Sequence, residues 1–174
     1  NNSQISQRDD IMSDNLVHAL QDKPYITVPL PLSKTQLDGA MDAFFAFLEL
    51  PDDIKNHIDT KLSPLHRRGD VGFKHRDPED GPYSDSKDFF HYHPLVLQEY
   101  KEFLQTQPIV KDFMEKAQPI WQMAYDIFYG LMAQIEPTYP GTLNQIFGSD
   151  RMHLIIRFLK YNWQTSTKYL AKPH

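Results

Sequence analysis

The chain has 174 residues and a formal net charge of −5 at pH 7, and 40% of its residues are hydrophobic. This length and apolar content suffice for one domain with a buried core. A negative net charge argues against a nucleic-acid-binding module, which normally presents a basic face. The sequence contains no cysteine, which excludes disulfide frameworks, zinc ribbons, iron–sulfur clusters and thiol catalysis.

The sequence predicts neither a membrane span nor a signal peptide. No apolar run approaches the roughly 20 residues that a membrane-spanning helix needs. The first ten residues are polar and lack the apolar stretch of a signal peptide. We therefore expect a cytoplasmic protein with no membrane or nucleic-acid partner, and the oligomeric state stays open.

The N-terminal region predicts one helix and one strand. Apolar residues recur every three to four positions between Asp9 and Leu20, which predicts an amphipathic helix. Pro24 ends it, because the residue before a proline avoids the helical conformation. Tyr25–Val28 is aromatic and β-branched, and therefore predicts a strand.

A capping box opens the next predicted helix. Ser33 is followed three residues later by Gln36, the spacing in which each side chain bonds the other's backbone. The helix is expected to bury an apolar face made of Leu37, Met41, Phe44, Phe45 and Leu48. Pro51 stops it and starts a short second helix with two aspartates in its first turn, where the helix dipole favours negative charge.

Strands are predicted at three places. Residues 59–84 are typical of a long loop, a candidate lid or substrate wall, with a short strand at Val71–Phe73. Lys87–Tyr92 and Met152–Tyr161 have strong β-propensity.

Helices are predicted between these strands. A helical region runs from Val96 to Ile135 with an interruption near Pro108, and Leu143–Phe147 forms another helical turn. The apolar stretch Trp121–Ile135 is expected to pack against the sheet, with its aromatic residues in the core. Pro119 marks a kink or a new first turn.

This order predicts an α+β protein. Helices dominate the first 150 residues, and a convincing strand comes only near the end, where it cannot form a sheet alone. We expect a single, incomplete domain: an N-terminal extension in residues 1–24, a mostly helical region in residues 25–150, and the first strands of a sheet core in residues 151–174.

Two histidines are metal-ligand candidates. His91 and His93 are two residues apart, so they lie on one face of the predicted strand and could share a metal. Alternatively, they are partly exposed histidines beside a proline. No third ligand is near in sequence, and we expect that they do not form a metal site.

Arg157 and Tyr161 are candidate ligand-binding residues. They lie four residues apart on one strand and therefore share a face, together with apolar neighbours. An arginine on an apolar face is costly unless a partner pairs with it. That partner is either an anionic ligand or an internal carboxylate, and the sequence leaves both open.

Several segments together resemble one family. Their order and spacing are similar to the N-terminal part of the isopenicillin N synthase-like group of iron(II)- and 2-oxoglutarate-dependent dioxygenases. The matching segments are Phe44–Lys55, Arg68-Gly69, Gly72-Phe73, Asp85–Phe90, Ile156–Tyr161 and Ala171–His174. Departures from the family pattern are Asp88 for glutamate, Leu159 for asparagine and Asn162 for proline.

The resemblance implies an oxygenase that oxidises a small molecule with dioxygen. It implies a double-stranded β-helix, or jelly roll, braced by the N-terminal helices, of which only the first part is present. His174 would be the first ligand of an iron(II) facial triad. Tyr161 would bind the cosubstrate 2-oxoglutarate, and Arg157 the substrate. No side chain is assigned a catalytic role, and the remaining iron ligands would lie past His174, so the fragment alone is expected to be inactive.

Two other interpretations remain. One is a jelly-roll-related binding module without metal catalysis. The other is an unrelated helical domain with accidental motif matches, which would be rejected if Lys87–Tyr92 and Met152–Tyr161 entered one sheet.

Overall fold

The computed structural model describes residues 16–58, 71–74, 87–148 and 154–161. The chain forms two compact units. One combines Asn1–Pro31 with Gln122–His153, and the other combines Leu32–Trp121 with Leu154–His174. The larger second unit contains the sheet.

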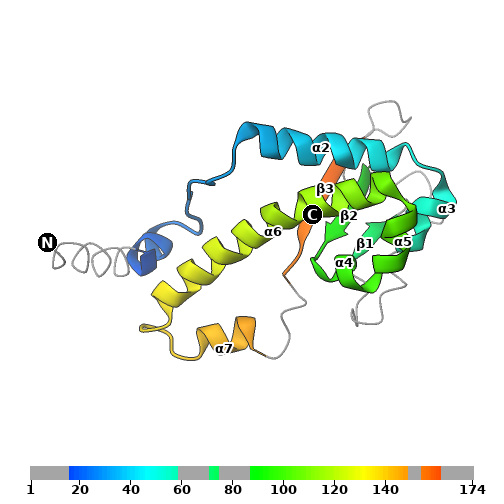
Figure 1. Cartoon of the computed structure of the whole chain (residues 1–174). Coiled ribbons are helices and arrows are strands. Elements are labelled where there is room, and N and C mark those ends of the chain that lie inside the picture. The colour runs from blue at the N-terminus through cyan, green and yellow to red at the C-terminus, as the bar shows by residue number, and fades with distance from the viewer. Residues whose placement is uncertain (1–15, 59–70, 75–86, 149–153, 162–174) are drawn as a thin grey trace, which may run out of the picture. The chain divides into compact units, whose positions relative to one another are not determined.

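The sheet has three antiparallel strands in the order β1-β2-β3 (Figure 1). They are β1 (Gly72–Lys74), β2 (Lys87–Tyr92) and β3 (Ile156–Tyr161). β2 has the predicted bounds, β1 is displaced by one residue, and β3 is shorter than predicted, since Leu154 and Ile155 lie outside it. The pairing of β2 with β3 contradicts a purely helical domain and gives a mixed architecture compatible with the α+β class.

A row of three phenylalanines crosses the sheet and forms the centre of the core. Phe73 is paired with Phe90, which is paired with Phe158. The ring of Phe113 lies 5.2 Å from Phe90 and 5.0 Å from Phe158, and that of Phe47 lies 5.5 Å from both Phe73 and Phe90. The helices that carry these two rings, α2 (Lys34–Leu48) and α6 (Pro108–Ile135), therefore pack on this face of the sheet.

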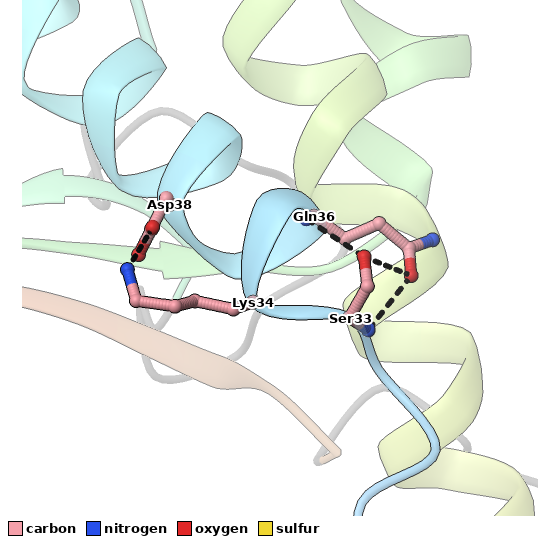
Figure 2. Close-up of polar contacts among 4 residues, drawn as sticks. All are labelled: Ser33, Lys34, Gln36 and Asp38. Carbon is pink, nitrogen blue, oxygen red and sulfur yellow. Dashed lines mark hydrogen bonds and ion pairs between the residues drawn. The ribbon is translucent and has the colours of Figure 1, made fainter.

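The predicted capping box begins α2 (Figure 2). The Gln36 amide N–H donates to Ser33 Oγ at 3.1 Å, and the Ser33 amide N–H donates to Gln36 Oε1 at 3.1 Å. Lys34 and Asp38 form an exposed ion pair one turn apart. The local sequence thus satisfies two backbone donors that the first turn leaves without helical partners.

Replacing Ser33 by alanine is expected to lower the free energy of unfolding by about 0.5–2 kcal/mol, the usual cost of losing such a cap. Chemical denaturation of the purified variants measures the loss. Ser33→Asp keeps an acceptor at the cap and should cost less. Equal losses for the two variants would contradict the capping role.

The buried face of α2 differs from the prediction. Ala40, Ala43, Phe44 and Phe47 are buried, whereas Phe45 is 41% exposed. Small alanines allow the helix to approach its neighbours closely, so the two flanking phenylalanines supply the packed volume. The pattern of large apolar residues wrongly included Phe45 in the buried face and left out the two alanines.

Short helices follow α2 and precede α6 in the chain. Pro51 precedes α3 (Asp52–Lys55) as predicted, and a 3-10 turn η1 (Asn56–Ile58) follows it. The ammonium group of Lys55 donates to the Leu48 carbonyl at 3.1 Å, which ties the end of α3 to the end of α2. The helices α4 (Leu95–Glu99) and α5 (Lys101–Thr106) lie between β2 and α6 in the chain.

α6 is continuous through Pro119. Its buried residues are Val110, Phe113, Met114, Ala117 and Trp121. The sequence placed the contact with the sheet at Trp121–Ile135, whereas Phe113, whose ring contacts Phe90 and Phe158, lies in the first half of the helix. Residues 122–135 of α6 belong to the other unit.

The smaller unit centres on one aromatic cluster. Phe147 of α7 (Thr142–Phe147) contacts the rings of Tyr125, Phe128 and Tyr129 at centroid distances of 5.5, 5.5 and 4.9 Å. Residues 16–22 are helical, as predicted. The strand expected at Tyr25–Val28 is wrong: the segment has no regular structure, and Tyr25 is 65% exposed.

A carboxylate closes the turn before α7. Glu136 Oε2 accepts the Leu143 amide N–H at 2.8 Å, and Oε1 accepts the Gly141 amide N–H at 2.7 Å. These hydrogen bonds favour the charged carboxylate and hold the pKa of Glu136 below its usual value. Gly141 has a φ of 95°, a left-handed conformation that glycine adopts without steric cost.

We expect the hydrogen bonds of this Glu136 cap on the Gly141 and Leu143 amides to weaken only in acid. Because the folded-state pKa is lowered, its contribution is complete above the usual glutamate pKa and is lost as pH falls through the lowered value. The amide chemical shifts of Gly141 and Leu143 should titrate with a midpoint below that of an ordinary glutamate. Glu136→Gln should abolish the titration; a midpoint at or above the ordinary value would contradict the cap.

Candidate functional site

The two predicted ligand-binding residues share one side of the sheet. Side chains alternate along a strand, so the residues paired as Lys87–Tyr161, Phe89–Leu159 and His91–Arg157 lie on the face opposite the phenylalanine row. We call these six residues the Arg157 face. It includes both Arg157 and Tyr161, whose side chains are exposed.

Two contacts hold Arg157 in place. Its Nε–H donates to His91 Nε2 at 2.7 Å, directly across the strand pair. Its guanidinium carbon lies 5.1 Å from the centroid of the Phe89 ring, within range of a cation–π interaction. The two rings are themselves neighbours, with centroids 4.9 Å apart. The guanidinium therefore extends from the row of His91 toward that of Phe89.

Neither contact is with one of the two partners that the sequence left open. The expected partner of Arg157 was an anionic ligand or an internal carboxylate, yet its contacts are an imidazole and an aromatic ring. Within the part of the chain that the structure describes, no ion pair includes Arg157. Its positive charge is consequently not neutralised by a carboxylate of these residues.

Tyr161 occupies a different part of the same face. Its side chain is 37% exposed, and it is paired with Lys87 at the last described position of β3. Four residues of a strand span roughly 13 Å. Tyr161 and Arg157 are thus expected to contact different ligands, or opposite ends of one ligand.

Each of the two histidines near the end of β2 accepts a hydrogen bond through one ring nitrogen. The lone pair of His91 Nε2 accepts the Arg157 Nε–H, and His93 Nδ1 accepts the Leu95 amide N–H at 3.1 Å. The His93 ring packs edge-on against Trp121, with centroids 5.0 Å apart. Both imidazoles are buried, so the interpretation as partly exposed histidines is wrong.

The described residues do not fit a metal ion. Among residues 16–58, 71–74, 87–148 and 154–161, no group of three or more His, Asp or Glu side chains is arranged to hold one. His174, the predicted iron ligand, lies outside these ranges, as does most of the predicted loop at residues 59–84. The iron assignment therefore depends on the sequence resemblance.

Tyr92 lies on the core side of β2 and has no place in the site. Its side chain is fully buried, and among the described residues its hydroxyl has no hydrogen-bond partner. Burial raises the pKa of Tyr92. The phenol therefore stays protonated at physiological pH and does not serve as a base.

Known proteins give no further guide. No family model, no curated protein and no solved structure matches this chain. The described helices also include none that is long and apolar enough to cross a membrane. The geometry of the Arg157 face and the sequence resemblance are therefore what a functional proposal can use.

Phe89 was not identified from the sequence as part of this site, and the only site role considered for His91 was that of a metal ligand. Phe89 and His91 have the alternation that places them on one face of β2, and this signal was readable. Their role as partners of Arg157 could not be read from the sequence, because it depends on which residue of β3 pairs with His91. That register joins residues 66 positions apart.

Proposed function

We propose that this chain is part of an iron(II)- and 2-oxoglutarate-dependent oxygenase that oxidises a small molecule, and that the Arg157 face is its ligand-binding surface. One observation carries the proposal: Arg157 and Tyr161, which the resemblance implicates, are exposed on the face opposite the core. A sheet with one face packed on helices and the other bearing polar side chains is suited to line a binding site.

The proposal gives these two residues separate tasks. Arg157 binds an anionic group of the substrate, and the Tyr161 hydroxyl donates a hydrogen bond to a carboxylate of 2-oxoglutarate. Their separation along β3 supports this division. Iron(II) and 2-oxoglutarate would supply the oxidising chemistry, and His174 would be one iron ligand.

The architecture is also compatible with the implied jelly roll. We propose that β1, β2 and β3 are the first strands of its double-stranded β-helix, with α2 and α6 bracing the outside. Antiparallel pairing throughout the described sheet is what that fold requires.

The binding of 2-oxoglutarate by the full-length protein with iron(II) tests the proposal. Tyr161→Phe removes one hydrogen bond to a charged group, so 2-oxoglutarate should bind roughly 10-fold or more weakly while iron still binds. Calorimetric titration measures both ligands. Tyr139→Phe, which removes another exposed tyrosine hydroxyl, is the matched control and should bind both normally.

Two results would contradict the proposal. Failure of the unmodified protein to bind iron(II) and 2-oxoglutarate would contradict an oxygenase. If small anions still bound to the Arg157 face, that outcome would favour the binding module without metal catalysis. Equal weakening by Tyr161→Phe and Tyr139→Phe would contradict the assignment of Tyr161.

A further inference from the structure

We infer that Arg157 receives the carboxylate of the substrate, and that His91 is the positioning residue that aims the guanidinium at it. The inference rests on the part of the proposed function that makes the Arg157 face a ligand site. It does not require iron.

The guanidinium retains the donors that a carboxylate needs. Arginine has five N–H donors, and the one on Nε is engaged by His91. The remaining four lie on the two terminal nitrogens of an exposed side chain. These two nitrogens form a planar fork that matches the two oxygens of a carboxylate.

His91 is built to hold this fork in one orientation. His91 is only 8% exposed, whereas Arg157 is exposed, so the anchor is buried and the charged side chain reaches solvent. The 2.7 Å hydrogen bond holds Nε, and the Phe89 ring supports the guanidinium from the neighbouring row. A long side chain held by two contacts loses less conformational entropy on ligand binding than a free one.

Because the anchor is a histidine, the guanidinium of Arg157 keeps its positive charge available. Because Arg157 Nε–H donates to His91 Nε2, that nitrogen carries no proton, and the imidazole in this contact is neutral. A carboxylate anchor would have neutralised the guanidinium. A neutral imidazole orients it and leaves its full positive charge to the ligand.

The surroundings select the class of ligand. Arg157 supplies the one positive charge at its end of the face, because Lys87 lies opposite Tyr161 at the other end. Phe89 and Leu159 beside Arg157 are apolar and half-buried. One cation next to apolar surface favours a single carboxylate on an apolar or aromatic body. A phosphate dianion is less suited, because one cation leaves half of its charge uncompensated.

Phenylacetate and its neutral analogue phenylacetamide test this inference without iron. The unmodified protein should bind phenylacetate about 10-fold or more tightly than phenylacetamide, because a hydrogen-bonded charge contributes that factor. Arg157→Gln should remove the difference. His91→Leu should weaken the binding of phenylacetate several-fold and leave the binding of phenylacetamide unchanged. His91→Gln should restore the binding of phenylacetate, because the glutamine amide oxygen can accept the Arg157 Nε–H.

Nuclear magnetic resonance reports the positioning directly. The Arg157 Nε proton should exchange slowly with water in the unmodified protein and in His91→Gln, and faster in His91→Leu. Equal affinity for the two probes in the unmodified protein would overturn the inference. So would His91→Leu weakening both probes alike, since that marks a purely structural role.

Competition separates the two possible carboxylates. If 2-oxoglutarate displaces phenylacetate from Arg157 without iron, the site belongs to the cosubstrate and the substrate assignment is overturned. If it does not displace phenylacetate, the assignment is supported. A protein that binds phenylacetate as expected but never binds iron would contradict the oxygenase and leave this inference standing.

Discussion

Replacing Phe113 by alanine is expected to lower the free energy of unfolding by about 3–5 kcal/mol, the usual cost of removing a buried phenylalanine ring. Phe113 is fully buried, and its ring lies 5.0–5.5 Å from four others, which belong to Phe44, Phe47, Phe90 and Phe158. Its removal leaves a cavity where α2, α6 and the sheet meet. Urea denaturation followed by tryptophan fluorescence measures the loss.

Two variants control for this experiment. Phe45→Ala removes the same ring from a half-exposed position of α2 and should cost about 1 kcal/mol or less. Phe113→Leu keeps part of the buried volume and should fall between the two. A loss for Phe113→Ala no greater than that for Phe45→Ala would contradict the central place of Phe113 in the core.

Replacing His174 by alanine is expected to remove iron binding from the full-length protein. The proposed function makes His174 one of three protein ligands of iron(II). Losing groups that merely orient metal ligands lowers metal affinity roughly 10- to 100-fold, and losing a ligand itself should lower the affinity for iron at least as much. Decarboxylation of 2-oxoglutarate should fall to near background. Metal content and carbon dioxide release measure the two effects.

His57→Ala is the matched control for His174→Ala. His57 is exposed and stacks on Phe103 with ring centroids 3.8 Å apart, so its loss removes an imidazole that has no part in the proposed site. Iron content and turnover should stay normal in this variant. Normal values in His174→Ala as well would show that His174 is not a ligand and would favour the binding module.

Local signals predicted the ends of several elements well. The capping box at Ser33 starts α2, and Pro51 and Pro108 precede or begin helices, because these residues act on backbone groups within a few positions. β2 has its predicted bounds, since aromatic side chains over six residues favour an extended chain. Tyr25–Val28 shows the limit of the same rule. It has the propensity of a strand but pairs with no strand of the described sheet.

Packing faces required information that no local pattern contains. On α2, the large apolar Phe45 was expected to be buried, yet the small Ala40 and Ala43 face the core. On α6, the more apolar second half was expected to meet the sheet, yet Phe113 in the first half does so. Which stripe of a helix is buried depends on how closely two elements approach, and this depends on the side chains of both.

The sequence by itself determined most of the helices and the three strands of the described sheet. It also determined the shared face of Arg157 and Tyr161, because alternation along one strand is a local property. Only the tertiary structure decided what holds Arg157. His91 and Arg157 are far apart in the chain, and the register of β2 against β3 places them opposite each other. A shift of one residue would have turned the other face of β3 toward His91, with Phe158 or Ile156 in place of the arginine. The ladder of hydrogen bonds between the strands therefore creates the site.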